Sequence, residues 1–201
     1  MGTLTLEKGA NLSLTKAAPN MKNAIVGLGW KVRRSDGVDY DLDASLFLLD
    51  SSGQVRSDKD FIYYFQMNSE CGSISHMGDD QEGSSESGDI DNVETKDCES
   101  VSIALNNVPL DIEKIIVAVT IYDAEKYKLN FGQIDGAYVR IIDADNKVVV
   151  AKYDLSEDAG VETSMIFCEI YRHNNEWKIK AVEQGYKSGL RELAIGYGVK
   201  L

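Results

Sequence analysis

Three aspartates occupy alternate positions at the start of the segment DYDLDASLFLL, residues 39–49. In an extended strand successive side chains point to opposite faces, so Asp39, Asp41 and Asp43 share one face, while a mostly apolar set from Tyr40 to Leu48 forms the other. Neighbouring carboxylates on the acidic face are about 6.6 Å apart and repel by about 0.6 kcal/mol in water, or about 2.5 kcal/mol at an effective dielectric of about 20. Folding does not require this repulsion. A calcium ion, which takes about six to eight oxygen ligands, would convert it into attraction.

A second acidic segment, GDDQEGSSESGDIDNVETKDCES at residues 78–100, could supply the remaining oxygens. It is much longer than a hairpin loop of about 2–5 residues, and its charge density favours disorder unless a cation is bound. Among its carboxylates are those of Asp79, Asp80, Glu82, Glu86, Asp89, Asp91, Asp97 and Glu99. The alternative is a solvated acidic loop beside an acidic strand edge that discourages aggregation. The choice depends on whether strand and loop lie together, which sequence patterns do not decide.

The alternating aspartates do not form an EF-hand. They fit the first half of that loop, but its sixth position is Ala44, where glycine makes the sharp turn, and its twelfth is Asp50, where a bidentate glutamate is expected. The residues after Asp43 also have strand composition.

The rest of the chain predicts an all-β protein. Short apolar or alternating runs rich in Val, Ile, Tyr and Phe are separated by turn signals such as DSSGQ and DADNK. Helical pattern is confined to residues 188–198 and 124–132, so one or two short helices are expected. Regularly spaced strands with few helices indicate an antiparallel β-sandwich of two sheets, or a barrel, within one domain over residues 1–201.

Composition excludes several classes of function. The 201 residues carry a formal net charge of −12, which disfavours nucleic acid and anionic membranes as partners. No apolar run is long enough to predict a transmembrane segment, and the first residues show no signal-peptide pattern. The three cysteines, Cys71, Cys98 and Cys168, are widely spaced and have no Cys/His cluster beside them. They argue against zinc or a disulfide framework and suit the reducing cytoplasm.

The sequence shows no recognisable arrangement of catalytic residues, so no enzyme activity is expected. The two histidines, His76 and His173, are read as structural or solvent-exposed, and GLGW lacks the spacing of a dinucleotide-binding motif. Cys71 and Cys98 flank the acidic segment, which leaves open a redox or metal-dependent reaction with an oxyanion. Neither thiol has a basic neighbour in sequence that would activate it.

Segments spread along nearly the whole chain resemble, in order, the TerD family of tellurium-resistance and stress proteins. They are LEKGANLSLTK (6–16), GLGW (27–30), DYDLDASLFLL (39–49), GQVRSDKDFIYY (53–64), HMGDD (76–80), VTIYDAE (119–125), NFGQI (130–134), KYDLSED (152–158) and EWKIKAVEQGY (176–186). The resemblance implies a cytoplasmic β-sandwich that binds calcium and acts in tellurite resistance and related stress responses.

The resemblance also implies a ligand set for two calcium ions. Carried over position by position, it consists of Asp41, Asp43, Asp79, Asp80, Asp97 and Glu99, with Asp39, Asp89 and Asp91 as weaker candidates. Cys98 replaces one acid of the family pattern. Extra sequence within about residues 78–100 forms a loop insertion, which leaves the roles of Asp89 and Asp91 open.

Three functional hypotheses follow. The first is a calcium-binding module in which calcium orders the acidic loop and creates an interaction surface. Its expected partners are other tellurium-resistance or stress proteins, including a membrane-associated complex. The second is a redox or metal-dependent enzyme acting on the tellurium oxyanion, although the acidic surface disfavours an anionic substrate. The third is a calcium-dependent sensor of a small ligand.

Overall fold

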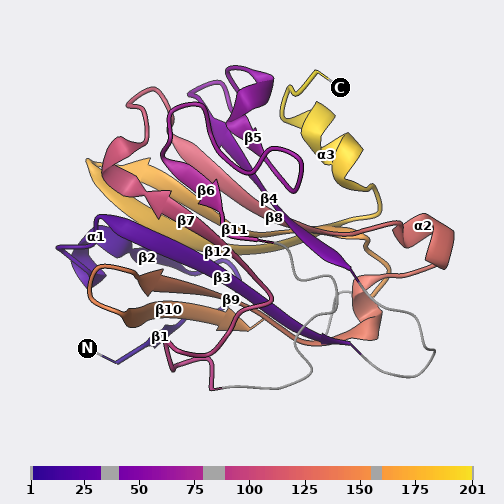
Figure 1. Ribbon diagram of the computed structural model, residues 1–201, viewed down its shortest axis with the longest axis horizontal. Helices are drawn as coiled ribbons and strands as arrows, with labels where there is room; N and C mark the ends of the chain where they lie inside the picture. Colours follow the sequence, from indigo (N-terminus) through magenta and orange to yellow (C-terminus); the bar gives the residue numbers. More distant parts are fainter. Residues whose placement is uncertain (1, 33–40, 79–88, 155–159, 201) are drawn as a thin grey trace.

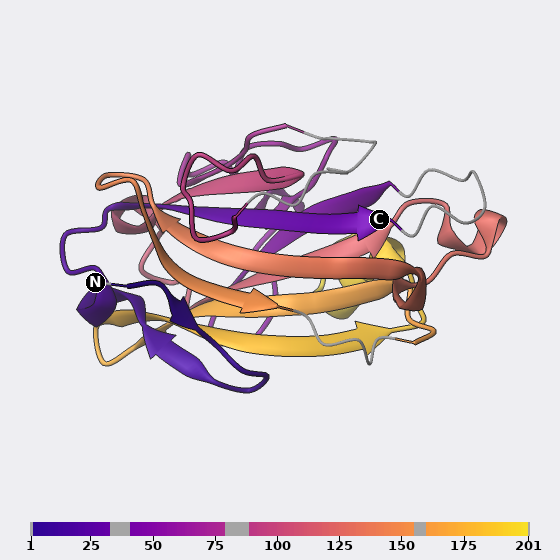
Figure 2. The same ribbon diagram turned by 90° about the horizontal axis from the view of Figure 1, so that it is seen from below.

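The computed structural model describes residues 2–32, 41–78, 89–154 and 160–200. Within these residues, two six-stranded sheets pack face to face as a β-sandwich (Figure 1, Figure 2). Neighbouring strands are antiparallel except β1 and β10, which are parallel. The prediction of an all-β fold built from two mainly antiparallel sheets is confirmed.

Each sheet is built from strands that are far apart in the sequence. In spatial order, the first sheet contains β1 (Leu4–Thr5), β10 (Val148–Asp154), β9 (Ile134–Asp143), β3 (Asn23–Val32), β7 (Glu99–Ala104) and β6 (Ile74–His76). The second contains β2 (Asn11–Ser13), β12 (Glu176–Tyr186), β11 (Ser164–His173), β8 (Lys114–Ile121), β4 (Leu42–Leu49) and β5 (Phe61–Ile62). The acidic strand β4 and the end of the acidic loop therefore belong to different sheets.

Three short helices are found among the described residues: α1 (Leu14–Ala17), α2 (Ala124–Tyr127) and α3 (Leu190–Gly196). The last two lie where helical pattern was predicted. Helix α1 was not expected, because a single turn leaves no periodicity in a segment with strand composition. The Ser13 hydroxyl caps α1 by accepting the Lys16 N–H at 3.2 Å. None of the described helices has the length and hydropathy needed to cross a membrane.

The two faces of β4 enter two different apolar clusters. Leu42, Ala44, Leu46 and Leu48 are buried in the main core between the sheets, as the alternation predicted. Phe47 and Leu49 point the other way and pack with residues of α3, which covers the outer face of the second sheet. The outer face of β4 is thus acidic at Asp43 and apolar at Phe47 and Leu49. The apolar end is the part that α3 covers.

The two glycines of GLGW leave space for side chains on the outer face of the first sheet. Gly27 lies opposite Arg140 on β9, and Gly29 lies opposite Tyr138. A Cβ atom added at Gly27 would overlap the carboxylate of Asp97, and one at Gly29 would overlap the Tyr138 ring. The motif therefore serves close side-chain packing over β3.

Replacing Gly27 with alanine is expected to lower the free energy of unfolding by about 3 kcal/mol, because the new methyl group must displace the buried Asp97 carboxylate. Urea denaturation measures the change. Gly160→Ala is the matched control, since nothing lies within 4 Å of its added Cβ; it is expected to change stability by less than about 0.5 kcal/mol. Equal stability of the two variants would contradict this account of the motif.

Candidate functional site

The acidic face of β4 is exposed to solvent only slightly. Asp43 is 5% exposed and lies opposite Thr120 of β8, while the Asp41 carbonyl accepts the Tyr122 N–H at 2.8 Å. Burial raises the pKa of the nearby Tyr64 phenol, and the charges of Asp43 and Asp41 raise it further. The charges of both aspartates therefore affect the same partly buried phenol, that of Tyr64.

Glu99, the first residue of β7, connects the two sheets at this end of the sandwich. It is 2% exposed, and its carboxylate accepts the backbone N–H of Ala44, the residue after Asp43. The pairing of Glu99 with Leu28 directs its side chain toward the inside of the sandwich. Topology thus brings one loop-end acid to β4, as the calcium hypothesis requires.

His76 belongs to the same buried group. It is 4% exposed, and its Nε2 lies 3.7 Å from Glu99 Oε2. The sequence placed His76 beside the acidic loop but gave it no role. Its position depends on β6 pairing with β7, across more than twenty intervening residues, and no local pattern reveals such a pairing.

Asp97 contacts Arg140 and Tyr138 in this structure, and its assignment as a calcium ligand stays a prediction. Its two oxygens accept hydrogen bonds from Arg140 Nε at 2.8 Å and Nη2 at 3.0 Å, and Tyr138 donates a third at 2.9 Å. Burial raises the pKa of the Asp97 carboxyl, while Arg140 and Tyr138 act in the opposite direction. The cation that Asp97 binds is therefore a side chain of the protein itself.

Arg140 also holds the loop that leads to Asp97. Its guanidinium donates to the carbonyls of Ile90 at 3.1 Å, Asn92 at 2.8 Å and Thr95, and its side chain is fully buried. The Arg140 guanidinium thus holds this half of the acidic segment against the first sheet.

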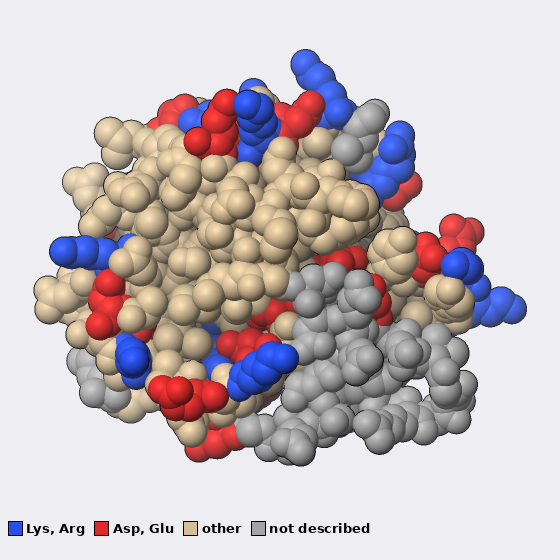
Figure 3. Space-filling model, viewed as in Figure 1, with Lys and Arg blue, Asp and Glu red and all other residues tan. Residues whose placement is uncertain are grey.

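The two weaker candidates in the same half are also engaged. Asp91 pairs with Lys152 at 2.8 Å, and Asp89 accepts the Asp91 N–H at 3.0 Å in a local turn. Along the lower margin of the face in Figure 3, acidic and basic side chains lie next to one another. Both aspartates are exposed, and their interactions are with Lys152 and with the loop itself. Among the described residues, neither forms an interaction with β4.

The described part of the chain contains no group of three His, Cys, Asp or Glu side chains that could hold a metal ion. Asp39, Asp79 and Asp80 lie outside the described residues. Asp41, Asp43 and Glu99 suit calcium in donor type, since all three are carboxylates, and two of them are deeply buried. A complete site would need further ligands from the undescribed residues.

The cysteines differ in accessibility. Cys98 and Cys168 are buried, and burial raises the pKa of the Cys168 thiol, whereas Cys71 is exposed. Partial burial raises the pKa of Cys71, but hydrogen bonds with the hydroxyls of Ser69 (3.4 Å) and Ser73 (2.9 Å) lower it, and the net shift is downward. Sequence reasoning considered only charged neighbours and missed these hydroxyls.

Replacing Asp97 with asparagine is expected to lower the free energy of unfolding by about 3–5 kcal/mol, because the buried Arg140 charge loses its counter-ion. Asp91→Asn, which breaks the more exposed pair with Lys152, should cost less than about 1 kcal/mol. Denaturant midpoints of the two variants and wild type provide the comparison. Similar small losses of stability in both variants would show that the ion pair between Asp97 and Arg140 is not a main source of stability.

Cys71 is expected to be the one cysteine that iodoacetamide modifies in the folded protein. Because the thiolate is the reactive form, the rate should rise with pH and reach half its maximum below the ordinary thiol value of 9.0. Mass spectrometry of quenched samples gives the rate, and Cys71→Ser should remove the modification. Labelling of Cys168 at a similar rate would contradict the burial described above.

Comparison with known proteins places these features in a family context. The model of the family described as TerD domain matches residues 1–197. The chain is 50% identical over 197 residues to "Tellurium resistance protein TerD" of Serratia marcescens, covering 98% of each chain, and 42% identical over 200 residues to "General stress protein 16U" of Bacillus subtilis, covering 99% of each. A solved homologue of telluride resistance protein from Streptomyces coelicolor has the same fold, with a TM-score of 0.63 and 16% identity over 87% of this chain and 96% of that one.

Proposed function

The chain belongs to the TerD domain family, whose members include tellurium-resistance and general stress proteins, and we propose that it is a calcium-binding module in such a response. The relatives' printed names support the biological setting. The buried carboxylates at β4 support the choice of a cation as ligand. The proposal assigns the protein a binding role and no catalytic step.

One observation carries the calcium proposal. Glu99, at 2% exposure, is held on the Ala44 N–H, directly after Asp43 at 5% exposure. Calcium binds through carboxylate oxygens, and these two side chains place such oxygens on neighbouring positions of the sandwich. Asp41, Asp43 and Glu99 would provide described ligands, and Asp79, Asp80 or Asp39 would complete the set. Two ions, as expected from the resemblance, stay a prediction.

The ion pair between Asp97 and Arg140 limits the part of the acidic segment that calcium would order. Residues 89–97 already lie against the first sheet through Arg140, so calcium would act on the preceding part of the acidic segment. Drawing Asp79 or Asp80 toward β4 would create a surface present only in the loaded protein. Proteins of the same resistance or stress system are the proposed partners for that surface.

Calcium binding is tested by calorimetry together with thermal melts in calcium, magnesium and chelator. Wild type is expected to bind calcium in preference to magnesium and to gain about 2.7 kcal/mol of stability when free calcium is about 100 times Kd. Asp43→Asn and Asp79→Asn should each weaken binding strongly, because each removes a charged ligand. Asp111→Asn, which removes an exposed carboxylate paired with Arg56, is the charge-matched control and should bind normally.

The pattern across the four proteins decides the outcome. Loss in both ligand variants, with the control unchanged, would place strand and loop in one site. Equal weak binding in all four would mean that the acidic residues carry surface charge and that the calcium proposal is wrong. Tellurite survival of cells expressing the same variants then tests whether loading is needed in the stress response.

A further inference from the structure

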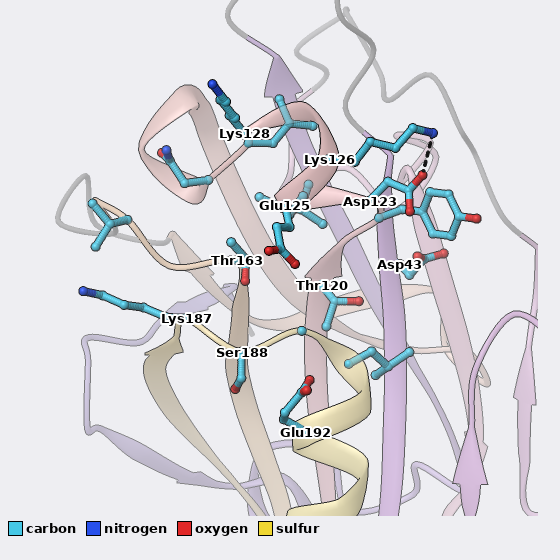
Figure 4. Close-up of a pocket in the computed structure, with 18 of the residues that line it drawn as sticks. Asp43, Thr120, Asp123, Glu125, Lys126, Lys128, Thr163, Lys187, Ser188 and Glu192 are labelled. Atoms are coloured by element: carbon cyan, nitrogen blue, oxygen red, sulfur yellow. Dashed lines mark hydrogen bonds and ion pairs between the residues drawn. The ribbon is translucent and has the colours of Figure 1, made fainter. Parts of the chain in front are cut away.

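A cleft of about 980 Å³ opens on the outer face of the second sheet (Figure 4). Its walls come from α2, the first residues of α3 with the turn before it, the end of β8, and residues just before β11. A volume of this size is within the range of small-molecule sites, about 300–1,000 Å³. Of the described calcium candidates, only Asp43 lines the cleft, at one edge.

The cleft is lined by Thr120, a nearly buried residue whose hydroxyl makes no hydrogen bond to any described residue. Asp43, Thr120 and Ser164 lie opposite one another across β4, β8 and β11, and so form a polar row on this face. Ser164 donates its hydroxyl hydrogen to the Ser188 carbonyl. Thr120, which lines the cleft and is 3% exposed, makes no side-chain hydrogen bond to any described residue. The Thr120 hydroxyl is therefore available to a molecule bound in the cleft.

The charges of the cleft are arranged to favour a cation. Glu125 of α2 and Glu192 of α3 point toward its centre from opposite sides, whereas the ammonium groups of Lys126, Lys128 and Lys187 point away (Figure 4). Lys126 is paired with Asp123 at 3.0 Å. Neither glutamate forms an ion pair within the described residues. An anionic ligand would therefore meet carboxylates inside and reach lysines only at the rim.

A metal ion is not the occupant that this arrangement fits. Within the described residues these carboxylates do not form a group close enough to hold one ion. An extended organic cation can span carboxylates that lie on opposite walls. Tyr64 and Tyr122 add aromatic surface at the edge, with ring centroids 6.4 Å apart and an interplanar angle of 88°. Such rings attract ammonium groups through cation–π interaction.

We propose that the cleft binds a linear aliphatic polyamine. Its ammonium groups pair with Glu125 and Glu192, and one of them donates a hydrogen bond to Thr120, while its methylene chain lies against the apolar part of the lining, such as Leu129 and Leu190. The inference goes beyond the calcium-dependent role and does not depend on it, because the two central glutamates are not calcium candidates.

Spermidine is the probe, titrated into the full chain by calorimetry at about 150 mM salt, where the Debye length of about 8 Å suppresses general attraction to an acidic surface. Wild type is expected to bind one spermidine saturably, in chelator and in calcium alike. Glu125→Gln and Glu192→Gln should each weaken binding about tenfold or more, because each loses a charge-assisted hydrogen bond. Thr120→Val, which keeps the β-branched shape, should weaken it several-fold.

Two controls separate a built site from general acidity. Glu94→Gln removes the same charge from an exposed position outside the cleft and should leave spermidine affinity unchanged. Thermal melts without ligand check that each variant is folded. Unsaturable binding, or equal weakening in Glu94→Gln and the cleft variants, would overturn the proposal. Spermidine binding that survives in chelator while calcium titration fails would separate this inference from the calcium proposal.

Discussion

The guanidinium of Arg140 is fully buried on the outer face of the first sheet, held by the Asp97 carboxylate and three backbone carbonyls. A permanent charge at such a position is tolerated only when all its donors are engaged, so residues 90–97 must cover it. The glycines of β3 leave the necessary room. Two residues after Asp97, β7 begins at Glu99, so the ion pair also fixes where Glu99 enters the space between the sheets.

This constraint divides the acidic charge of the protein into two kinds. Asp91 and Asp97 have counter-ions within the chain, in Lys152 and Arg140. Asp43 and Glu99 are buried at β4, and Nε2 of His76 lies 3.7 Å from the Glu99 carboxylate. The net charge of −12 therefore does not act as one uniform surface, because several carboxylates are buried or paired within the chain.

Strand β4 carries Asp43, which belongs to both proposed binding regions. Glu99 approaches the edge of the strand at Ala44 from the inner side, and Asp43 looks outward beside Thr120 and the cleft. The rest of the outer face is closed by α3, whose residues pack on Phe47. Asp43 thus lies at the boundary of the two regions, while Glu125 and Glu192, the proposed polyamine contacts, lie outside the calcium candidates.

The sequence by itself determined the all-β class, the inward face of β4 from Leu42 to Leu48, and two of the three described helices, because strand alternation and helical periodicity are local. It also identified Asp43 and Glu99 as members of the acidic group. Only the tertiary structure decided that Asp97 pairs with Arg140, 43 residues away, and that His76 joins Glu99. Residue type shows that a carboxylate needs a cation; which cation it meets depends on strand order, and that is set by packing over the whole chain.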